Sequence, residues 1–385
     1  MPSACRSCSR LGGLSKMSAT GRVALFRGPR QPFDMAEMPV PEPRPGAVLV
    51  RVRIANICGS DLHAWRGDFR LAGLGGKLPT VLGHEMTGTI AALGRDVDRD
   101  SNGEPLHEGD HVVFAYFTGC GHCPSCLRGR RAACDHIDMA MTGDATEWPH
   151  FVGGYGEYFY VKPGSTIYKV PPKLPLEIVA GANCALAQVI AGFERANLSF
   201  DETVVIQGAG GLGLYATAVA KAFGARLVVV LDAISDRLAM AKRFGADVTI
   251  NIAEETDEKS RVNQVKALTD GRGADIVMEL VGRADVVPEG IRMLAQFGRY
   301  VGIGNINAGQ SHPFDPSRLV MTNKSMLGVA LYEPYTLGKA LRFLERNRDR
   351  LPLDQLLSAK FPLDQINEAF AQADRRAVLR ASLVP

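Results

Sequence analysis

The 385-residue sequence lacks several features that define other classes of protein. Its formal net charge is only +3 and no long basic block occurs, so neither nucleic acid nor a membrane surface is expected as a partner. No apolar run reaches the length of a membrane span, and the run at residues 227–231 is short enough for a buried strand. Internal repeats and low-complexity segments are also absent from the sequence. The content of 46% hydrophobic and 22% charged residues indicates a globular protein, long enough for two domains.

The eight cysteines are unevenly distributed along the chain. Disulfides of a secreted protein would be spread over its length, whereas four cysteines here lie within fifteen residues: Cys120, Cys123, Cys126 and Cys134. Their spacing is typical of a metal site in a reducing compartment, so the cytoplasm is the predicted location.

The N-terminal segment differs from the rest of the chain. Residues 1–16 contain Cys5 and Cys8 but no acidic residue, and no apolar stretch follows that could serve as a secretory core. The two cysteines have no further ligands nearby, and the segment lacks the amphipathic period of a transit peptide. We expect residues 1–19 to be a disordered extension, and Met17 is a candidate start of the protein.

Two kinds of pattern divide the remainder. Residues 48–54 alternate, and short β-like runs continue to residue 161, which predicts an irregular, mostly β domain over residues 20–185, completed by residues 336–385. In residues 186–335 buried strands alternate with helices. This second pattern predicts a doubly wound α/β domain of the Rossmann type, with parallel strands at residues 203–207, 227–231, 276–279 and 299–303.

A glycine-rich turn follows the first of these strands: Gly208-Ala209-Gly210-Gly211-Leu212-Gly213. Glycines allow a tight turn and close approach to a pyrophosphate, which the N-terminus of the following helix would bind. Asp232 ends the next strand, where its carboxylate would bind the adenosine ribose and repel a 2′-phosphate, so NAD is favoured over NADP. Arg237 is a candidate to cover the adenosine. The alternative interpretation is a structural glycine turn with a helix-capping aspartate.

The four clustered cysteines, at Cys120, Cys123, Cys126 and Cys134, can surround one tetrahedral Zn²⁺ and leave no open position. Such a closed site is structural rather than catalytic. An iron–sulfur cluster is the competing interpretation, although the last gap is longer than in bacterial ferredoxins and no proline follows the fourth cysteine.

A third set of candidate ligands is dispersed and consists of Cys58, His84 and Cys184, with Glu85 beside the histidine. Three such ligands and an open position would form a catalytic zinc site. Spacing alone does not show that they converge, because a buried cysteine or histidine is often simply packed.

These three constellations, in this order, resemble the zinc-containing medium-chain dehydrogenase/reductase family, whose best-known members are alcohol dehydrogenases. The resemblance covers residues 21–385 and implies a GroES-like catalytic domain beside the Rossmann domain. It implies that Cys58, His84 and Cys184 bind a catalytic zinc and that the other four cysteines bind a structural one. It also implies supporting roles near the catalytic zinc, with an acidic neighbour (Glu85), a carboxylate that orients the histidine (Asp61) and a proton relay (Ser60 and His63).

The resemblance further implies a substrate pocket and a second cofactor contact. Tyr116, Phe69 and Phe151 would line the pocket, and Arg380 would bind pyrophosphate. Two features depart from the family. Gly59 stands where well-studied relatives have a basic residue, and residues 69–77 form a longer insert near the expected cleft.

The parts together predict a zinc-dependent oxidoreductase that transfers a hydride between a small-molecule alcohol (primary, secondary or cyclic) and NAD, with zinc stabilising the alkoxide. Two alternatives stay open. One is a polyol or threonine-type dehydrogenase of the same family, which usually has a carboxylate in place of Cys184, and the other is a non-catalytic nucleotide-binding scaffold. A homodimer or homotetramer is expected, joined through the late strand at residues 299–303 and the run at residues 325–331.

Overall fold

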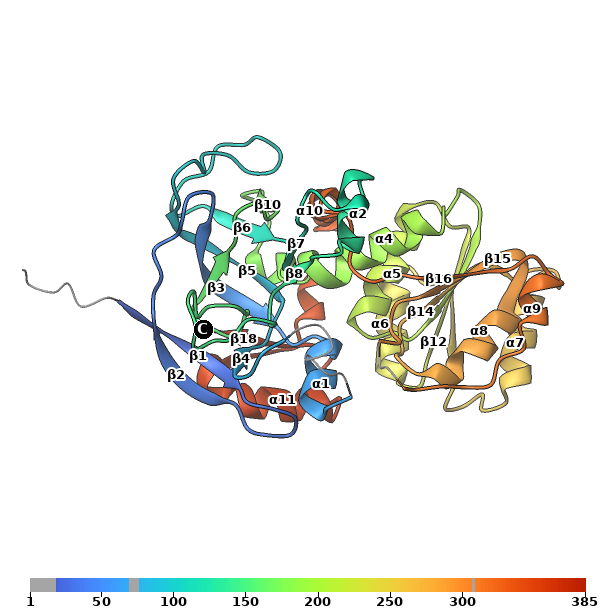
Figure 1. Cartoon of the computed structure of the whole chain (residues 1–385). Coiled ribbons are helices and arrows are strands. Elements are labelled where there is room, and N and C mark those ends of the chain that lie inside the picture. The colour runs from blue at the N-terminus through green and yellow to red at the C-terminus, as the bar shows by residue number, and fades with distance from the viewer. Residues whose placement is uncertain (1–18, 69–75, 307–308) are drawn as a thin grey trace, which may run out of the picture.

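The computed structural model describes residues 19–68, 76–306 and 309–385. A mostly β domain and a parallel α/β domain lie side by side, as Figure 1 shows. Of the predicted N-terminal extension only Ala19 is described, and its carbonyl oxygen accepts the N–H of Val40 (2.8 Å). Cys5, Cys8, Phe69 and most of the insert at residues 69–77 lie outside the described residues.

The first domain is built on a seven-stranded sheet in the order β10-β6-β5-β3-β18-β17, with β9 also paired to β3. These strands are β3 (Val48–Asn56), β5 (Glu85–Leu93), β6 (His111–Phe114), β9 (Tyr158–Val161), β10 (Ile167–Lys169), β17 (Ala359–Pro362) and β18 (Ala381–Val384). The predicted alternation in β3 is confirmed, since Val50 and Val52 are buried while Arg51 and Arg53 are exposed. A smaller sheet in the order β2-β1-β4 consists of β1 (Thr20–Phe26), β2 (Asp34–Pro39) and β4 (Thr80–Val81).

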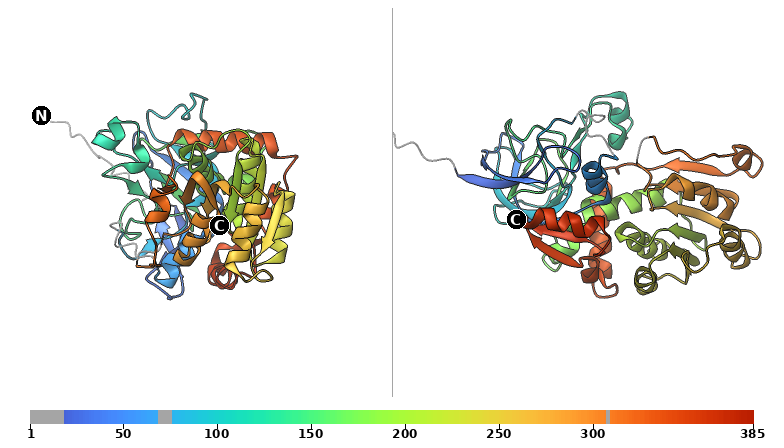
Figure 2. Two further views of the ribbon diagram at one scale, coloured as in Figure 1. Left: turned by 90° about the vertical axis from the view of Figure 1, so that its right-hand side faces the viewer. Right: turned by 90° about the horizontal axis from the view of Figure 1, so that it is seen from below.

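The C-terminal segment returns to the first domain. Strand β18 pairs antiparallel with β3, and the helix α11 (Ile366–Asp374) contacts both β18 and α1 (Gly59–Arg66). Figures 1 and 2 therefore place the red end of the chain beside the blue one, although they are far apart in sequence.

The second domain contains a parallel sheet in the order β13-β12-β11-β14-β15-β16. Its strands are β11 (Thr203–Gln207), β12 (Leu227–Asp232), β13 (Val248–Asn251), β14 (Ala274–Glu279), β15 (Leu294–Gly302) and β16 (Ser325–Gly328). The helices are α5 (Gly211–Ala222), α6 (Ser235–Arg243), α7 (Glu258–Ala267), α8 (Val287–Met293) and α9 (Ser317–Val320). The order of strands reverses between β11 and β14, which is where such sheets bind a ligand beyond the strands' carboxyl ends. The four predicted strands correspond to β11, β12, β14 and β15, whereas β13 and α7 were not expected from the pattern.

A continuous helical segment links the domains through α3 (Leu176–Val179), the π-helical turn η3 (Ala182–Leu186) and α4 (Ala187–Arg195). Together they form one 20-residue helix that is long and apolar enough to cross a membrane. The uninterrupted apolar runs of the sequence did not predict a segment of this length. Because 78% of its most apolar window is buried inside the protein, it is a core helix. The helix α10 (Tyr335–Asn347) packs against it.

Candidate active site

The sulfur of Cys58 lies at the junction of β3 and α1, where Cys58 is the N-cap of the helix. The N–H of Cys58 donates to Oδ2 of Asp61 (2.9 Å), so the first helical turn holds the thiol and the carboxylate in a fixed relation. His84 immediately precedes β5, the strand that neighbours β3 in the same sheet.

Cys184 reaches the same place from the segment between the domains. It lies in the middle of the π-helical turn η3, a local widening of a helix that often occurs at functional sites. The ligand atoms of Cys58, His84, Glu85 and Cys184 all lie within 4.8 Å of one another, and all four residues are buried. The structure therefore brings together the three predicted ligands and the predicted acidic neighbour.

The charges in this cluster favour a thiolate on Cys58 and a proton on His84. Hydrogen bonding from Cys184 holds the pKa of the Cys58 thiol well below its usual value, and the charge of His84 acts in the same direction. Burial lowers the pKa of His84, but the carboxylate of Asp61 and the thiolate of Cys58 outweigh it, so this pKa lies well above its usual value. A thiolate, a second thiol and an imidazole form the ligand set known for catalytic zinc in alcohol dehydrogenases.

Glu85 supports the same interpretation. Its Oε2 forms an ion pair with Nη1 of Arg380 and accepts a hydrogen bond from Nδ2 of Asn56 (3.3 Å). Its Oε1 is buried and has no hydrogen-bond partner in the described part of the chain. Burial raises the pKa of Glu85 to about 8, against the opposing charge of Arg380. An orphaned carboxylate oxygen beside two sulfurs and an imidazole fits a bound metal ion.

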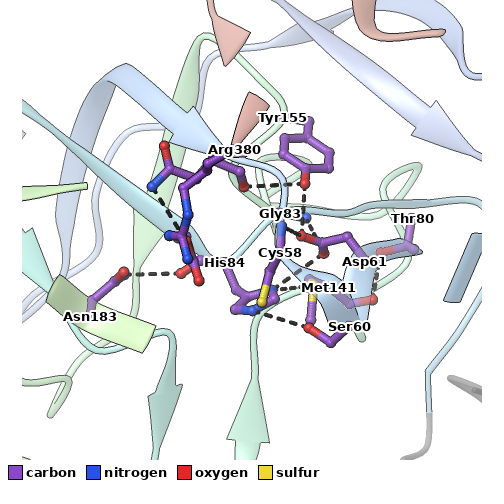
Figure 3. A network of polar contacts seen from close by, with 12 residues as sticks. Cys58, Ser60, Asp61, Thr80, Gly83, His84, Met141, Tyr155, Asn183 and Arg380 are labelled. Carbon is purple, nitrogen blue, oxygen red and sulfur yellow. Dashed lines mark hydrogen bonds and ion pairs between the residues drawn. The ribbon is translucent and has the colours of Figure 1, made fainter. Parts of the chain in front are cut away.

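Asp61 connects the ligands to the core, as Figure 3 shows. Its Oδ1 lies 3.3 Å from Nδ1 of His84, so Nε2 is the imidazole nitrogen that would face a metal. The same carboxylate accepts hydrogen bonds from the hydroxyl of Tyr155 (2.7 Å) and the N–H of Gly83 (3.3 Å). The ring of His84 is thus oriented by a buried anion, as the resemblance implied.

The four-cysteine cluster forms a separate lobe. Its base is the antiparallel pair β7 (Phe117–Thr118) and β8 (Asp138–Met139), and its ligands flank α2 (Pro124–Leu127) and η2 (Arg131–Ala133). The four sulfurs lie within 4.8 Å of one another, and those of Cys120, Cys123 and Cys134 accept backbone N–H groups at 3.2–3.4 Å. The N–H of Cys126 lowers the pKa of the Cys123 thiol to about 6, which favours a thiolate. Glu333 anchors the lobe from outside by accepting the N–H groups of Arg131 and Ala132 (2.9 and 3.2 Å).

The glycine turn lies between β11 and α5, at the point where the strand order reverses. Gly208 has φ +101°, and a Cβ on Gly213 would overlap the carbonyl oxygen of Gly208, so both positions require glycine. Gly210 is the N-cap of α5, and Gly211 and Leu212 begin it. The guanidinium of Arg380 lies beside this end of the helix, where a Cβ on Gly211 would be 2.5 Å from its Nη2.

Asp232 ends β12 next to the glycine turn. Its carboxylate accepts the N–H groups of Ala209 (2.7 Å) and Ile234 (2.9 Å). Arg237 is near enough for the charge of Asp232 to act on it, although burial lowers the pKa of that arginine. The predicted acid therefore also stabilises the turn.

Comparison with known proteins agrees with this geometry. Residues 44–172 match the alcohol dehydrogenase GroES-like domain, and residues 211–346 match the zinc-binding dehydrogenase family. The chain belongs to the zinc-containing medium-chain dehydrogenases. It is therefore an oxidoreductase of the zinc-dependent alcohol and polyol dehydrogenase class.

Relatives of this zinc dehydrogenase differ in their substrates. The 5-exo-hydroxycamphor dehydrogenase of Pseudomonas putida is 34% identical, with 89% of this chain and 93% of that protein covered. The erythritol/L-threitol dehydrogenase of Mycolicibacterium smegmatis is 32% identical, with 94% and 97% covered. The crystal structure of an alcohol dehydrogenase from Thermotoga maritima has a TM-score of 0.89 and 30% identity, and covers 96% of this chain and 100% of that chain.

The predicted relay and pocket residues of the dehydrogenase are only partly brought together. Oγ of Ser60 lies 3.3 Å from Nε2 of His84, while Nδ1 of His63 lies 3.2 Å from Oδ2 of Asp68. The ring of Tyr116 packs against His84, with ring centroids 4.9 Å apart.

The structure corrects the prediction that Phe151 lines the substrate pocket. Its ring is buried against Tyr158 with centroids 5.5 Å apart, and it would meet a Cβ on Gly21, so it belongs to the core of the β domain rather than to the metal site. Phe69, the other predicted pocket phenylalanine, is outside the described residues.

Three residues at the site were not predicted from the sequence. Tyr155 donates to Asp61, and Sδ of Met141 lies 3.3 Å from Nδ1 of His84. Asn183, next to Cys184, donates to the carbonyl oxygens of His84 and Phe114 (both 3.0 Å). Their partners are 57 to 99 residues away in sequence, so no local pattern indicates them.

Proposed function

We propose that this dehydrogenase oxidises a small-molecule alcohol, or reduces the corresponding carbonyl compound, with one catalytic zinc, one structural zinc and NAD. The observation that carries the proposal is the buried convergence of Cys58, His84 and Cys184 with an oxygen of Glu85 that has no hydrogen-bond partner among the described residues. When bound, zinc would supply a Lewis acid for the alcohol oxygen, and NAD would supply the hydride acceptor. For the cysteine lobe, family membership favours zinc over an iron–sulfur cluster.

The residues around the site would orient the metal ligand, transfer the proton and bind the cofactor. Asp61 keeps the proton of His84 on Nδ1, so that Nε2 is available to the metal. Ser60 would accept the alcohol proton at its Oγ and release its own hydroxyl proton, and His63, whose imidazole contacts Asp68, would take up the released proton and deliver it to solvent. Arg380 neutralises Glu85 and lies at the N-terminus of α5, where a pyrophosphate would bind.

The choice of NAD rather than NADP rests on Asp232. Its carboxylate stands at the carboxyl end of β12, directly beside the glycine turn. A phosphate on the adenosine ribose would meet this negative charge, whereas ribose hydroxyls can donate hydrogen bonds to it. We therefore propose NAD as the preferred cofactor.

For the substrate, we propose a bulky, apolar secondary alcohol, with a cyclic alcohol as the first choice. The support is twofold. The walls next to His84 that the structure describes include Tyr116 and Met141, both buried, and a relative at 34% identity is named for 5-exo-hydroxycamphor, a cyclic alcohol. Polyol and threonine dehydrogenases are the second candidate, because relatives at 32% and 30% identity carry those names. Against them stands Cys184, at a position where such enzymes usually have a carboxylate.

The decisive experiment combines metal analysis with a substrate panel. The purified protein should contain two zinc ions per chain, and NADH should form with cyclic and other secondary alcohols in preference to erythritol or threonine. Each alcohol is tested with NAD⁺ and with NADP⁺. One zinc ion per chain would refute the catalytic site, and a preference for polyols would establish the second candidate.

We also propose that the enzyme is a cytoplasmic homo-oligomer, dimeric or tetrameric. Free cysteines in two ligand clusters suit a reducing compartment. Strand β16 is the last of its sheet, and in the described residues it pairs only with β15. Met326 in this edge strand is 50% exposed, and Val320 and Met321, which precede the strand, are also exposed. A second copy of the chain could cover these apolar side chains.

A further inference from the structure

Glu279 is a buried carboxylate that the proposed reaction does not use. It is the last residue of β14 and has no exposed surface. Because β14 is one of the two strands that flank the reversal of strand order, its end faces the crevice in which a dinucleotide would lie. A charge in such a position is expensive to bury unless hydrogen bonds compensate it.

Backbone N–H groups from two crevice loops provide this compensation. Oε1 of Glu279 accepts the N–H groups of Val281 (2.7 Å) and Gly282 (2.6 Å), and Oε2 accepts that of Asn305 (3.0 Å). The main-chain oxygen of Glu279 accepts the N–H groups of Ile303 (3.2 Å) and Gly304 (3.1 Å). One residue thus ties the loop after β14 to the loop after β15.

These loops lie between the glycine turn and the proton relay. A Cβ on Gly208 would be 3.2 Å from Cγ2 of Val281, and a Cβ on Gly282 would be 3.8 Å from Nε2 of His63. The adenosine end of the crevice is marked by Asp232 at the end of β12, on the other side of β11. The Glu279 loops therefore border the opposite end, nearest the metal ligands, which is where the nicotinamide ring has to lie for hydride transfer.

We infer that Glu279 is a positioning residue for the nicotinamide end of the cofactor, and that its negative charge favours the oxidised form. The inference rests on the proposed use of NAD. The nicotinamide ring of NAD⁺ carries a positive charge that NADH lacks, so a buried anion beneath the ring's site stabilises the oxidised cofactor selectively. The small residues Gly282 and Gly304 let the two loops meet over the carboxylate, since a Cβ on Gly304 would be 2.8 Å from the nitrogen of Gly282.

The test compares three ligands on the zinc-loaded protein: NAD⁺, NADH and ADP-ribose, which lacks the nicotinamide. Glu279→Gln removes the charge and turns an amide N–H₂ toward backbone donors. Its affinity for NAD⁺ should fall by about tenfold more than its affinity for NADH, the order expected for one charge pair at protein-like dielectric. Affinity for ADP-ribose should stay within about threefold. Calorimetry or NADH fluorescence provides these dissociation constants.

Glu289→Gln is the matched control. Glu289 is also a buried carboxylate of this domain, but it pairs with Arg261 (2.6 Å) in α7, away from the crevice loops. The Glu289→Gln variant should have a lower melting temperature than the wild type but the same ratio of NAD⁺ to NADH affinity. If Glu279→Gln does not fold, Glu279→Asp, which withdraws the charge by one methylene, should show smaller losses in the same order.

Equal losses for NAD⁺ and NADH, or a parallel loss for ADP-ribose, would overturn the inference, because a merely structural residue would act on all three alike. A wild-type protein that binds neither NADH nor NADPH would instead refute the proposed function. If the wild type binds NADPH alone, the same comparison is made with NADP⁺ and NADPH.

Discussion

Replacing Asp61 by asparagine should weaken binding of the catalytic zinc while leaving the structural zinc unaffected. The aspartate is buried, and its two oxygens receive the N–H of Cys58, the hydroxyl of Tyr155 and the N–H of Gly83, in addition to facing Nδ1 of His84. An asparagine has the same shape but only one oxygen. Its amide N–H₂ would therefore point at some of the donors that the carboxylate accepts.

The size of the effect follows from these contacts. Loss of a carboxylate that orients a metal-binding histidine typically weakens metal affinity by about 10- to 100-fold, or roughly 1.4–2.7 kcal/mol. Each buried donor left without an acceptor costs about 1–3 kcal/mol of folding stability. We therefore expect the variant to hold its zinc more weakly and to have a lower melting temperature.

The assay is zinc analysis after dialysis against chelators of increasing strength. The wild type should retain two zinc ions at a chelator strength where Asp61→Asn retains one. Tyr155→Phe is the matched control, since it removes a single donor to Asp61 and keeps the ring packed against Phe33 and Phe370. If Asp61→Asn and the wild type lose zinc at the same chelator strength, Asp61 does not orient a metal ligand and the reasoning is wrong.

Three further predictions concern the structural zinc, the cofactor and the oligomer. Cys126→Ser should reduce the zinc content from two ions to one and lower the melting temperature, while the remaining zinc stays at the catalytic site. Asp232→Gly should shift the ratio of kcat/KM for NAD⁺ and NADP⁺ toward NADP⁺ by about tenfold, and should also weaken NAD binding because Ala209 and Ile234 lose their acceptor. Met326→Lys should dissociate the oligomer in light scattering, toward the monomer mass of 41.5 kDa.

Each of these has a contrary outcome. Zinc lost from both sites in Cys126→Ser would mean that the lobe and the catalytic cluster are not independent. Asp232→Asn removes the charge but keeps an acceptor for the turn, so an unchanged cofactor ratio in both variants would mean that another residue recognises the ribose. A wild type that is already monomeric at micromolar concentration would refute the oligomer.

The parts of the site that could be predicted from the sequence are those in which neighbouring residues act together. The glycine turn is preceded by a buried strand and followed by a helix, so its conformation is specified within about ten residues. The four cysteines of the lobe are likewise close in sequence, and their spacing alone indicates a shared metal. In both cases the chemistry requires groups that one short segment can supply.

The catalytic cluster is different, because 100 residues separate His84 from Cys184 and a family resemblance was needed to relate them. Contacts of this kind depend on how the sheet of the first domain packs against the helical segment between the domains. Tyr155 and Asn183 were not predicted for the same reason. The unexpected β13 has a simpler cause: it contains only one buried residue, Ile250, so its pattern is weak.

The edge strand shows that the sequence alone does not tell which of its apolar residues are exposed and can be replaced by a charge. The late strand at residues 299–303 and the run at residues 325–331 are both expected at the edge of the sheet, but only β16 lies there, because β15 pairs with both β14 and β16. Within the run at residues 325–331, the sequence alone suggests Val329 as a position where a charge would dissociate an oligomer. Val329 lies just beyond the strand, its N–H donates to Gly302 (3.0 Å) and only 7% of it is exposed. A charge there would disrupt the core, so the exposed Met326 is the correct position.

The roles of the buried carboxylates are likewise not evident from the sequence, which contains many acidic residues. What distinguishes these carboxylates is the set of hydrogen-bond donors around each one. Asp61 accepts the N–H of the metal-binding Cys58, and Glu279 accepts backbone N–H groups from two loops. Glu85 pairs with Arg380, and its other oxygen has no partner in the part of the chain that the structure describes. Burying a charge is unfavourable, so each carboxylate is retained with a specific set of donors. Amide substitutions should therefore separate the three by their readouts. Zinc retention should change most at Asp61, and the ratio of NAD⁺ to NADH affinity should change most at Glu279.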